Sequence, residues 1–219
     1  MSSGRVFRFG PSSESRSSTA SEHASERRPS RLFVFLHGCG ATAQSMIPIA
    51  FKFQARFPSA ALVVPSGFDP GARGSCAQDW YPTRGLNVDN HRERVAAMLP
   101  DIEDLVRREQ TNFAVPASRT VLIGFSQGGT VALEAVKTPG LAAAVVAFSA
   151  RYARLPAKGA VAVRIVPVFL GQGGHVKRDL PQLVVEAQSA YPAVRMVLEP
   201  AVGEQAAFVE AVATVIAGR

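Results

Sequence analysis

The residues best suited to chemistry in this sequence are a serine and its flanking glycines, because residues 124–128 read Gly-Phe-Ser-Gln-Gly. In the Gly-x-Ser-x-Gly pattern, a tight turn between a strand and a helix projects the serine hydroxyl above a sheet. Small residues are required on both sides, since a Cβ there would collide as the backbone reverses. An apolar run at 120–123 precedes the pattern, and Gly129 permits close packing at the start of a helix. We therefore predict Ser126 as a nucleophile, in preference to an ordinary glycine-rich turn.

A second glycine-rich turn, Leu-His-Gly-Cys-Gly at 36–40, ends the first predicted core strand. We expect the N–H of Cys39 to point into the site beside the N–H of Gln127, which lies at the positive end of a helix, so that the two form an oxyanion hole. Both donors are main-chain groups, so the side chains of Cys39 and Gln127 are expected to carry little of the oxyanion-hole role. His37 is a conceivable base, but its position favours hydrogen bonds to the nearby loop backbone.

The elements that must position these groups are apolar runs of strand length that alternate with segments of helical period. This alternation predicts an α/β fold with a mostly parallel central sheet flanked by helices. Residues 31–219 are expected to form a single domain, whereas the Ser- and Arg-rich residues 1–30 are expected to be largely disordered, with a possible short first strand. The expected strands are 32–36, 60–64, 120–123, 141–148, 163–170 and 194–198, and the expected helices are 45–57, 87–110, 127–137, 180–191 and 205–216. Pro100 should kink or divide the second of these helices.

Composition excludes several other classes of protein. The formal net charge is +7, but the cationic residues are scattered among acids and not interleaved with aromatics, which argues against nucleic-acid binding. No apolar run approaches the ~20 residues that a membrane-spanning helix needs. Two cysteines are too few for a disulfide framework and favour a cytoplasmic location.

Together these motifs resemble those of the bacterial carboxylesterases related to acyl-protein thioesterases and small phospholipases. The resemblance spans residue 32 to the C-terminus and rests on the segments 36–40, 79–81 (Asp-Trp-Tyr), 89–90 (Asp-Asn), 123–129 and 146–149. It implies an α/β-hydrolase fold and hydrolysis of small-molecule or acyl-chain esters and thioesters, with no metal or other cofactor. It also implies a substrate pocket lined by Trp80, with His37 nearby.

The resemblance further implies a catalytic acid and base that this sequence lacks at the matching positions. The acid position falls on Gly174, within Leu-Gly-Gln-Gly-Gly at 170–174, and the base position falls on Glu204. A serine hydroxyl is a weak nucleophile until a positioned base takes its proton. A glutamate, with a reference pKa of about 4.3, is a weaker base than an imidazole at about 6.5.

The chain contains four histidines that could supply a base. His175 directly follows the vacant acid position and is the candidate, although it could equally be an exposed loop histidine. His23 lies in the segment expected to be disordered, and His91 is expected on the polar side of its helix.

Two functions follow from these observations. The first is a serine esterase or thioesterase whose activity is weak because the triad is incomplete. The alternative is a catalytically silent relative that keeps the fold and binds a ligand or a protein partner.

Overall fold

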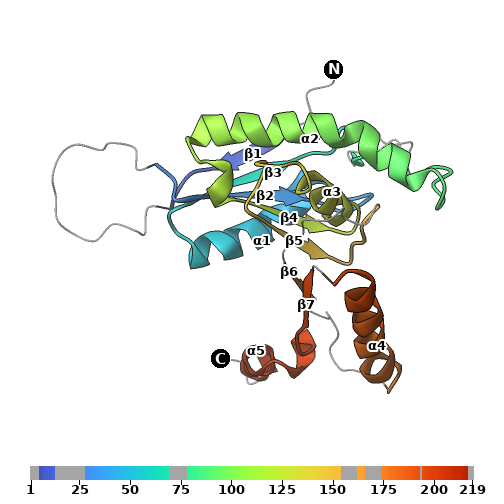
Figure 1. Ribbon diagram of the computed structural model, residues 1–219. Coiled ribbons are helices and arrows are strands. Elements are labelled where there is room, and N and C mark those ends of the chain that lie inside the picture. The colour runs from blue at the N-terminus through green and yellow to red at the C-terminus, as the bar shows by residue number, and fades with distance from the viewer. Residues whose placement is uncertain are drawn as a thin grey trace. The chain divides into compact units, whose positions relative to one another are not determined.

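The computed structural model describes residues 5–12, 28–69, 78–153, 162–165, 174–192 and 194–216. The chain divides into two compact units, Met1–Leu155 and Pro156–Arg219, and each is described here by itself (Figure 1). The prediction of one domain over residues 31–219 stays a prediction.

The first unit is built on a five-stranded sheet with the order β1-β3-β2-β4-β5. The central strands β3, β2, β4 and β5 run parallel, and β1 pairs antiparallel with β3 at the edge. Parallel neighbours end at the same sheet edge, so Leu36 lies opposite Gly124 and Phe125 opposite Phe148. The strands are β1 (Val6–Phe9), β2 (Arg31–Leu36), β3 (Ala60–Pro65), β4 (Thr120–Phe125) and β5 (Ala144–Phe148).

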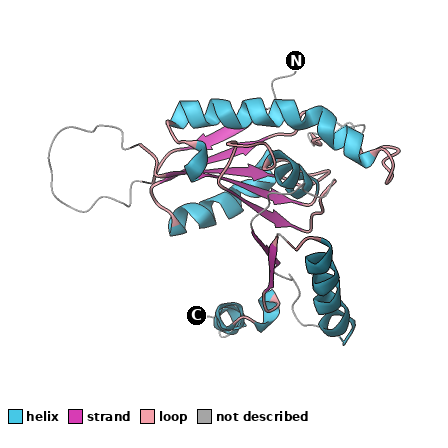
Figure 2. Ribbon diagram, viewed as in Figure 1, coloured by secondary structure: helices cyan, strands magenta, loops and turns pink. Residues whose placement is uncertain are grey.

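Helices cover both faces of this sheet, which explains why its central strands are apolar at almost every position (Figure 2). Successive side chains of a strand point to opposite faces. Leu32, Val34 and Leu36 therefore pack in one core cluster with residues of α2 and α3, whereas Phe33 and Phe35 pack in a second cluster with residues of α1. The helices are α1 (Ala43–Arg56), α2 (His91–Phe113) and α3 (Gln127–Ala135).

The helix α2 continues through Pro100, so of the two expected effects of this proline, a kink or a division, the helix is not divided. A proline inside a helix removes one backbone hydrogen bond and clashes with the preceding turn. Here a long buried stripe offsets that cost, and it consists of His91, Val95, Met98, Ile102, Leu105, Val106 and Glu109.

The second unit contains a parallel pair of strands, β6 (Ala162–Ile165) and β7 (Arg195–Leu198), with the helices α4 (Gly174–Ala190) and α5 (Ala206–Ile216) and the short 3₁₀ helix η3 (Val202–Glu204). The side-chain amide of Gln188 joins α4 to the start of β7, because it donates to the Val194 carbonyl at 2.7 Å and accepts from the Met196 N–H at 2.9 Å. The expected strand at 163–170 is described only as far as Ile165, and the loop at 171–173 lies outside the described residues. No helix in the described part of the chain has the length and apolar character needed to cross a membrane.

Candidate active site

Ser126 lies in the sharp turn that joins β4 to α3, and its backbone is strained. Its φ of 51° and ψ of −114° fall where few residues other than glycine are found. A Cβ on Gly124 would come within 2.3 Å of the Gly128 carbonyl oxygen, so only glycine fits at this position of the turn. The Ser126 N–H donates to the Phe148 carbonyl of β5 at 2.8 Å. This is the strand-turn-helix geometry that displays a nucleophile.

The end of β2 closes against the same turn. A Cβ on Gly128 would approach the carbonyl oxygens of Leu36 and His37 to 2.3 and 2.4 Å, so the glycine allows two backbones to touch. Cys39, just beyond β2, lines the same cavity as Ser126 and Gln127. Gln127 is the first residue of α3, where backbone N–H groups have no acceptor within the helix. The predicted oxyanion-hole residues therefore gather around Ser126.

A buried carboxylate holds the Cys39 loop in place. Asp79 accepts hydrogen bonds from the Gly40 N–H at 2.7 Å, from the Cys39 thiol at 3.3 Å and from the Thr83 hydroxyl at 3.3 Å. The sequence pointed to the Asp-Trp-Tyr segment only by resemblance. In the structure, the Asp79 carboxylate connects the loop that contains Cys39 and Gly40 to its own loop, which also contains Thr83.

The side chain of Gln127 joins the site to the same segment, a structural role separate from the expected oxyanion-hole role of its main-chain N–H. Its Oε1 accepts from the Trp80 N–H at 2.9 Å, and its Nε2 donates to the Tyr81 carbonyl at 2.8 Å. The amide is buried, so it fixes the position of the Trp80–Tyr81 backbone across from the nucleophile.

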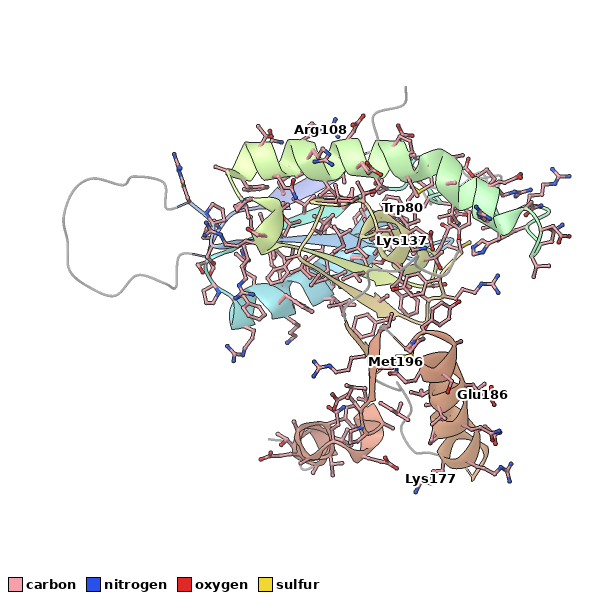
Figure 3. All side chains as sticks on the ribbon, in the orientation of Figure 1. Trp80, Arg108, Lys137, Lys177, Glu186 and Met196 are labelled. Carbon is pink, nitrogen blue, oxygen red and sulfur yellow. The ribbon has the colours of Figure 1, made fainter. Side chains whose placement is uncertain are left out.

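Trp80 and His37 are not among the residues that line the described cavity, and their predicted part in a substrate pocket stays a prediction. Trp80 lies within the first unit (Figure 3) and is 1% exposed. Its indole N–H donates to the His37 carbonyl at 2.8 Å. The His37 ring is fully buried, with Nε2 accepting from the Gly67 N–H at 3.2 Å and Nδ1 within 2.9 Å of the Gly38 carbonyl. This agrees with the preferred interpretation of His37 as a loop-binding histidine, because both ring nitrogens are occupied by backbone.

The cavity beside Ser126 contains an imidazole that sequence reasoning rejected. His91 begins α2, is 6% exposed rather than on a polar face, and has its Nε2 3.0 Å from the Tyr81 hydroxyl. His91 stands four residues before Val95, and residues four apart lie on the same face of a helix. The spacing of the apolar stripe could therefore have predicted that His91 is buried. The cavity measures about 330 Å³ and is lined by Cys39, Tyr81, Thr83, Leu86, His91, Ser126, Gln127, Thr130, Ser149, Ala150 and Arg151.

Burial keeps the two aromatic groups of this cavity uncharged near neutral pH. The pKa of His91 is lowered, chiefly by burial and secondly by the positive charge of Arg151. The pKa of Tyr81 is raised to about 12, again chiefly by burial. The imidazole is therefore in its basic form at pH 7.

The remaining predicted residues belong to the second unit. Gly174 and His175 are the first two residues of α4, and Glu204 ends η3 with its carboxylate 3.8 Å from the Lys177 ammonium. Their predicted roles as acid position, candidate base and base position stay predictions. Among the residues that the structure describes, no group of three or more His, Cys, Asp or Glu side chains could hold a metal ion.

A family model described as phospholipase/carboxylesterase matches residues 19–191, which is most of the chain. The chain belongs to this family. The match includes the turn at Ser126, the Cys39 loop and the Trp80 segment, and so it covers every site residue described above in the first unit.

Curated relatives carry names consistent with this membership. Esterase YpfH of Escherichia coli strain K12 is 37% identical over 143 residues, which cover 65% of this chain and 61% of that protein. Acyl-protein thioesterase 1 of Cryptococcus neoformans is 28% identical over 155 residues, covering 64% of this chain and 63% of that one. The chain thus spans about three fifths of the length of the curated relatives it matches.

Solved structures confirm the α/β-hydrolase fold. The crystal structure of esterase PE8 superposes with a TM-score of 0.61 at 16% identity, covering 99% of this chain and 98% of that one. A carboxylesterase from Mesorhizobium loti gives a TM-score of 0.56 at 16% identity, covering 88% and 91% of the two chains.

Proposed function

We propose that this member of the phospholipase/carboxylesterase family is a serine esterase acting on small-molecule esters or thioesters. The single observation that carries the proposal is the strained backbone of Ser126 at the wall of a cavity shared with Cys39 and Gln127. Such strain persists only where the surrounding structure enforces it. In the proposed reaction, the Ser126 hydroxyl attacks the ester carbonyl and gives its proton to the base, while the N–H groups of Cys39 and Gln127 stabilise the oxyanion. The bond to the alcohol or thiol then breaks and that group leaves with the proton, after which water attacks the acyl-serine and releases the carboxylic acid. A cytoplasmic location belongs to the same proposal.

Three residues compete for the role of the base. His91 lines the cavity with Ser126 in its neutral form, and its Nε2 is engaged by the Tyr81 hydroxyl, a contact that it would have to give up to take a proton from Ser126. His175 and Glu204 are the candidates from the sequence. Glu204 stands at the family's base position but is a weaker base than histidine, and neither His91 nor His175 stands at that position, so we propose that turnover is slow.

Covalent labelling with a fluorophosphonate tests this function directly. We expect one label per chain, on Ser126, formed more slowly than on a serine hydrolase with a complete triad, because an unactivated hydroxyl is mostly protonated. Ser126→Ala should abolish both labelling and ester hydrolysis, whereas Ser45→Ala, on the exposed start of α1, should leave both unchanged. Labelling that persists in Ser126→Ala would refute the assignment of the nucleophile.

A catalytically silent binding protein is the second candidate, and it is favoured by Gly174 and Glu204 at the acid and base positions. Absence of both labelling and hydrolysis in the unmodified protein would select it. The individual changes His91→Ala, His175→Ala and Glu204→Ala then separate the three possible bases in an active protein, because only loss of the true base removes the labelling.

A further inference from the structure

The cavity beside Ser126 is positively charged. Among the described residues that line it, none is an aspartate or a glutamate, and His91 and Tyr81 are both neutral at pH 7 for the reasons given above. Arg151 is therefore the side chain that carries a charge at neutral pH among the described residues that line this cavity. A substrate entering the cavity therefore meets a cation close to the reacting serine.

Arg151 is held near this site by the turn that follows β5. The strand ends at Phe148, whose carbonyl accepts the Ser126 N–H, and Ser149 has a φ of 50° that redirects the chain. The positive charge of Arg151 acts on both the Tyr81 hydroxyl and the His91 ring. It adds to burial in lowering the pKa of His91, and it partly offsets the burial that raises the pKa of Tyr81. Arg151, Tyr81 and His91 all line the same cavity.

The acids nearest to this cavity have other partners. Asp79 accepts the Gly40 N–H and two side-chain donors, as described above. Glu134 accepts from the Lys137 ammonium at 2.7 Å and from the Ala153 N–H at 2.9 Å. Within the described part of the chain, the Arg151 side chain makes no hydrogen bond and no ion pair. Its five planar donors suit a carboxylate or a phosphate, to which arginine binds in a bidentate manner.

We propose that the cavity binds a small ester that also carries a negatively charged group, a carboxylate or a phosphate, with Arg151 binding the anion while Ser126 attacks the ester carbonyl. The cavity volume of about 330 Å³ lies near the lower end of ligand pockets and limits the substrate to a short chain. The hydroxyls of Thr83, Thr130 and Ser149 can supply further donors to such a ligand. This inference rests on the proposed esterase function, whose failure the following experiment detects separately.

A matched pair of esters tests the inference. Monomethyl glutarate carries one carboxylate, and dimethyl glutarate is the neutral counterpart of similar length. We expect kcat/KM to be higher for the monomethyl ester, and Arg151→Gln to lower that value by about ten- to a hundredfold, as expected for a lost hydrogen bond to a charged group. Hydrolysis of the dimethyl ester should change less than about threefold. Arg151→Lys should recover part of the preference, and Arg119→Ala, which removes an equal charge before β4, should keep it.

Calorimetric titration of the Ser126→Ala protein with the same two esters gives a readout that needs no turnover. Tighter binding of monomethyl glutarate than of dimethyl glutarate, lost with Arg151→Gln, supports the inference even if the unmodified protein hydrolyses neither ester. Absence of hydrolysis with such binding would count against the esterase function alone. Titration with 2-acetoxyethyl phosphate shows which anion is preferred. Equal binding of the charged and neutral esters, or a preference that survives in Arg151→Gln, overturns the inference.

Discussion

Gln127 takes part in the site through two different groups. Its N–H begins α3 beside Ser126, and its side-chain amide binds the Trp80 N–H and the Tyr81 carbonyl. The nucleophile turn and the loop across the cavity are therefore held together by one residue. A pattern of the form Gly-x-Ser-x-Gly leaves this position open, yet the buried amide satisfies two backbone groups that would otherwise be unpaired.

We predict that Gln127→Ala destabilises the protein by about 1–3 kcal/mol, because it leaves a buried N–H and a buried carbonyl without partners. Ester hydrolysis should fall as well, since the Tyr81 side of the cavity loses its support. Urea unfolding measures the first effect. The exposed Gln182→Ala in α4 is the matched control and should change the free energy of unfolding by less than about 0.5 kcal/mol. A Gln127→Ala protein as stable as its parent would contradict this account.

At the scale of elements, one ion pair ties the edge strand β1 to the helix α2. Two nitrogens of Arg8, Nε and Nη2, donate to the Glu109 carboxylate at 2.7 Å, and the Asn112 side-chain amide donates to it at 3.2 Å. The Glu109 side chain is fully buried, whereas the Arg8 side chain is 42% exposed. Burial alone would raise the pKa of Glu109, but the hydrogen bonds from Arg8 and Asn112 outweigh it and the pKa is lowered. The carboxylate is thus charged inside the fold because β1 is in place.

Arg8→Ala should destabilise the protein by about 1–3 kcal/mol at pH 7, less than for a fully buried pair because Arg8 is partly exposed to solvent. A carboxyl whose folded pKa lies below its unfolded value stabilises the fold above that unfolded value, and this stabilisation is lost as the pH falls through the folded pKa. In Arg8→Ala, burial should instead raise the pKa of Glu109. The difference in unfolding free energy between variant and parent should therefore shrink between pH 7 and pH 4.

Urea unfolding at several pH values checks this expectation. Arg107→Ala, on the exposed face of the same helix, removes the same charge and should show neither effect. A difference between Arg8→Ala and its parent that stays constant with pH would mean that Glu109 does not depend on Arg8 for its charge.

At the scale of the whole molecule, the predicted nucleophile and the predicted acid and base positions belong to different compact units. Ser126, Cys39 and Gln127 lie in the first unit, and Gly174, His175 and Glu204 lie in the second.

The double change Gly174→Asp with Glu204→His tests whether these two positions are the acid and base positions of this chain. If they are, hydrolysis of an activated ester should rise measurably, and either single change should do much less because triad members act as a unit. A misplacement of ~1 Å can cost about a hundredfold in rate, so a modest gain is the expected result. A normally folded double variant with no gain over an inactive parent would contradict the assignment of these positions. Loss of activity from an active parent would show that Glu204 or His175 already works in the site.

The sequence by itself determined the order of strands and helices and the turn at Ser126, because both depend on local patterns. Burial on two faces makes a strand apolar throughout, and the reversal at Ser126 requires glycines at fixed spacing. The sequence also pointed to the Cys39 loop, since the end of an apolar strand marks the carboxyl edge of a parallel sheet.

Only the tertiary structure decided which side chains face the cavity. Trp80 and Tyr81 are neighbours in a loop without periodicity and both are buried in the same core cluster, so nothing local says that only Tyr81 also lines the cavity. His91 has a polar side chain, and its burial depends on the Tyr81 hydroxyl, which comes from that separate loop. Arg151 acquires its role only because neighbouring segments place neutral groups around it and engage the nearby acids elsewhere. Such choices depend on contacts between distant segments, and these form only when the chain has folded.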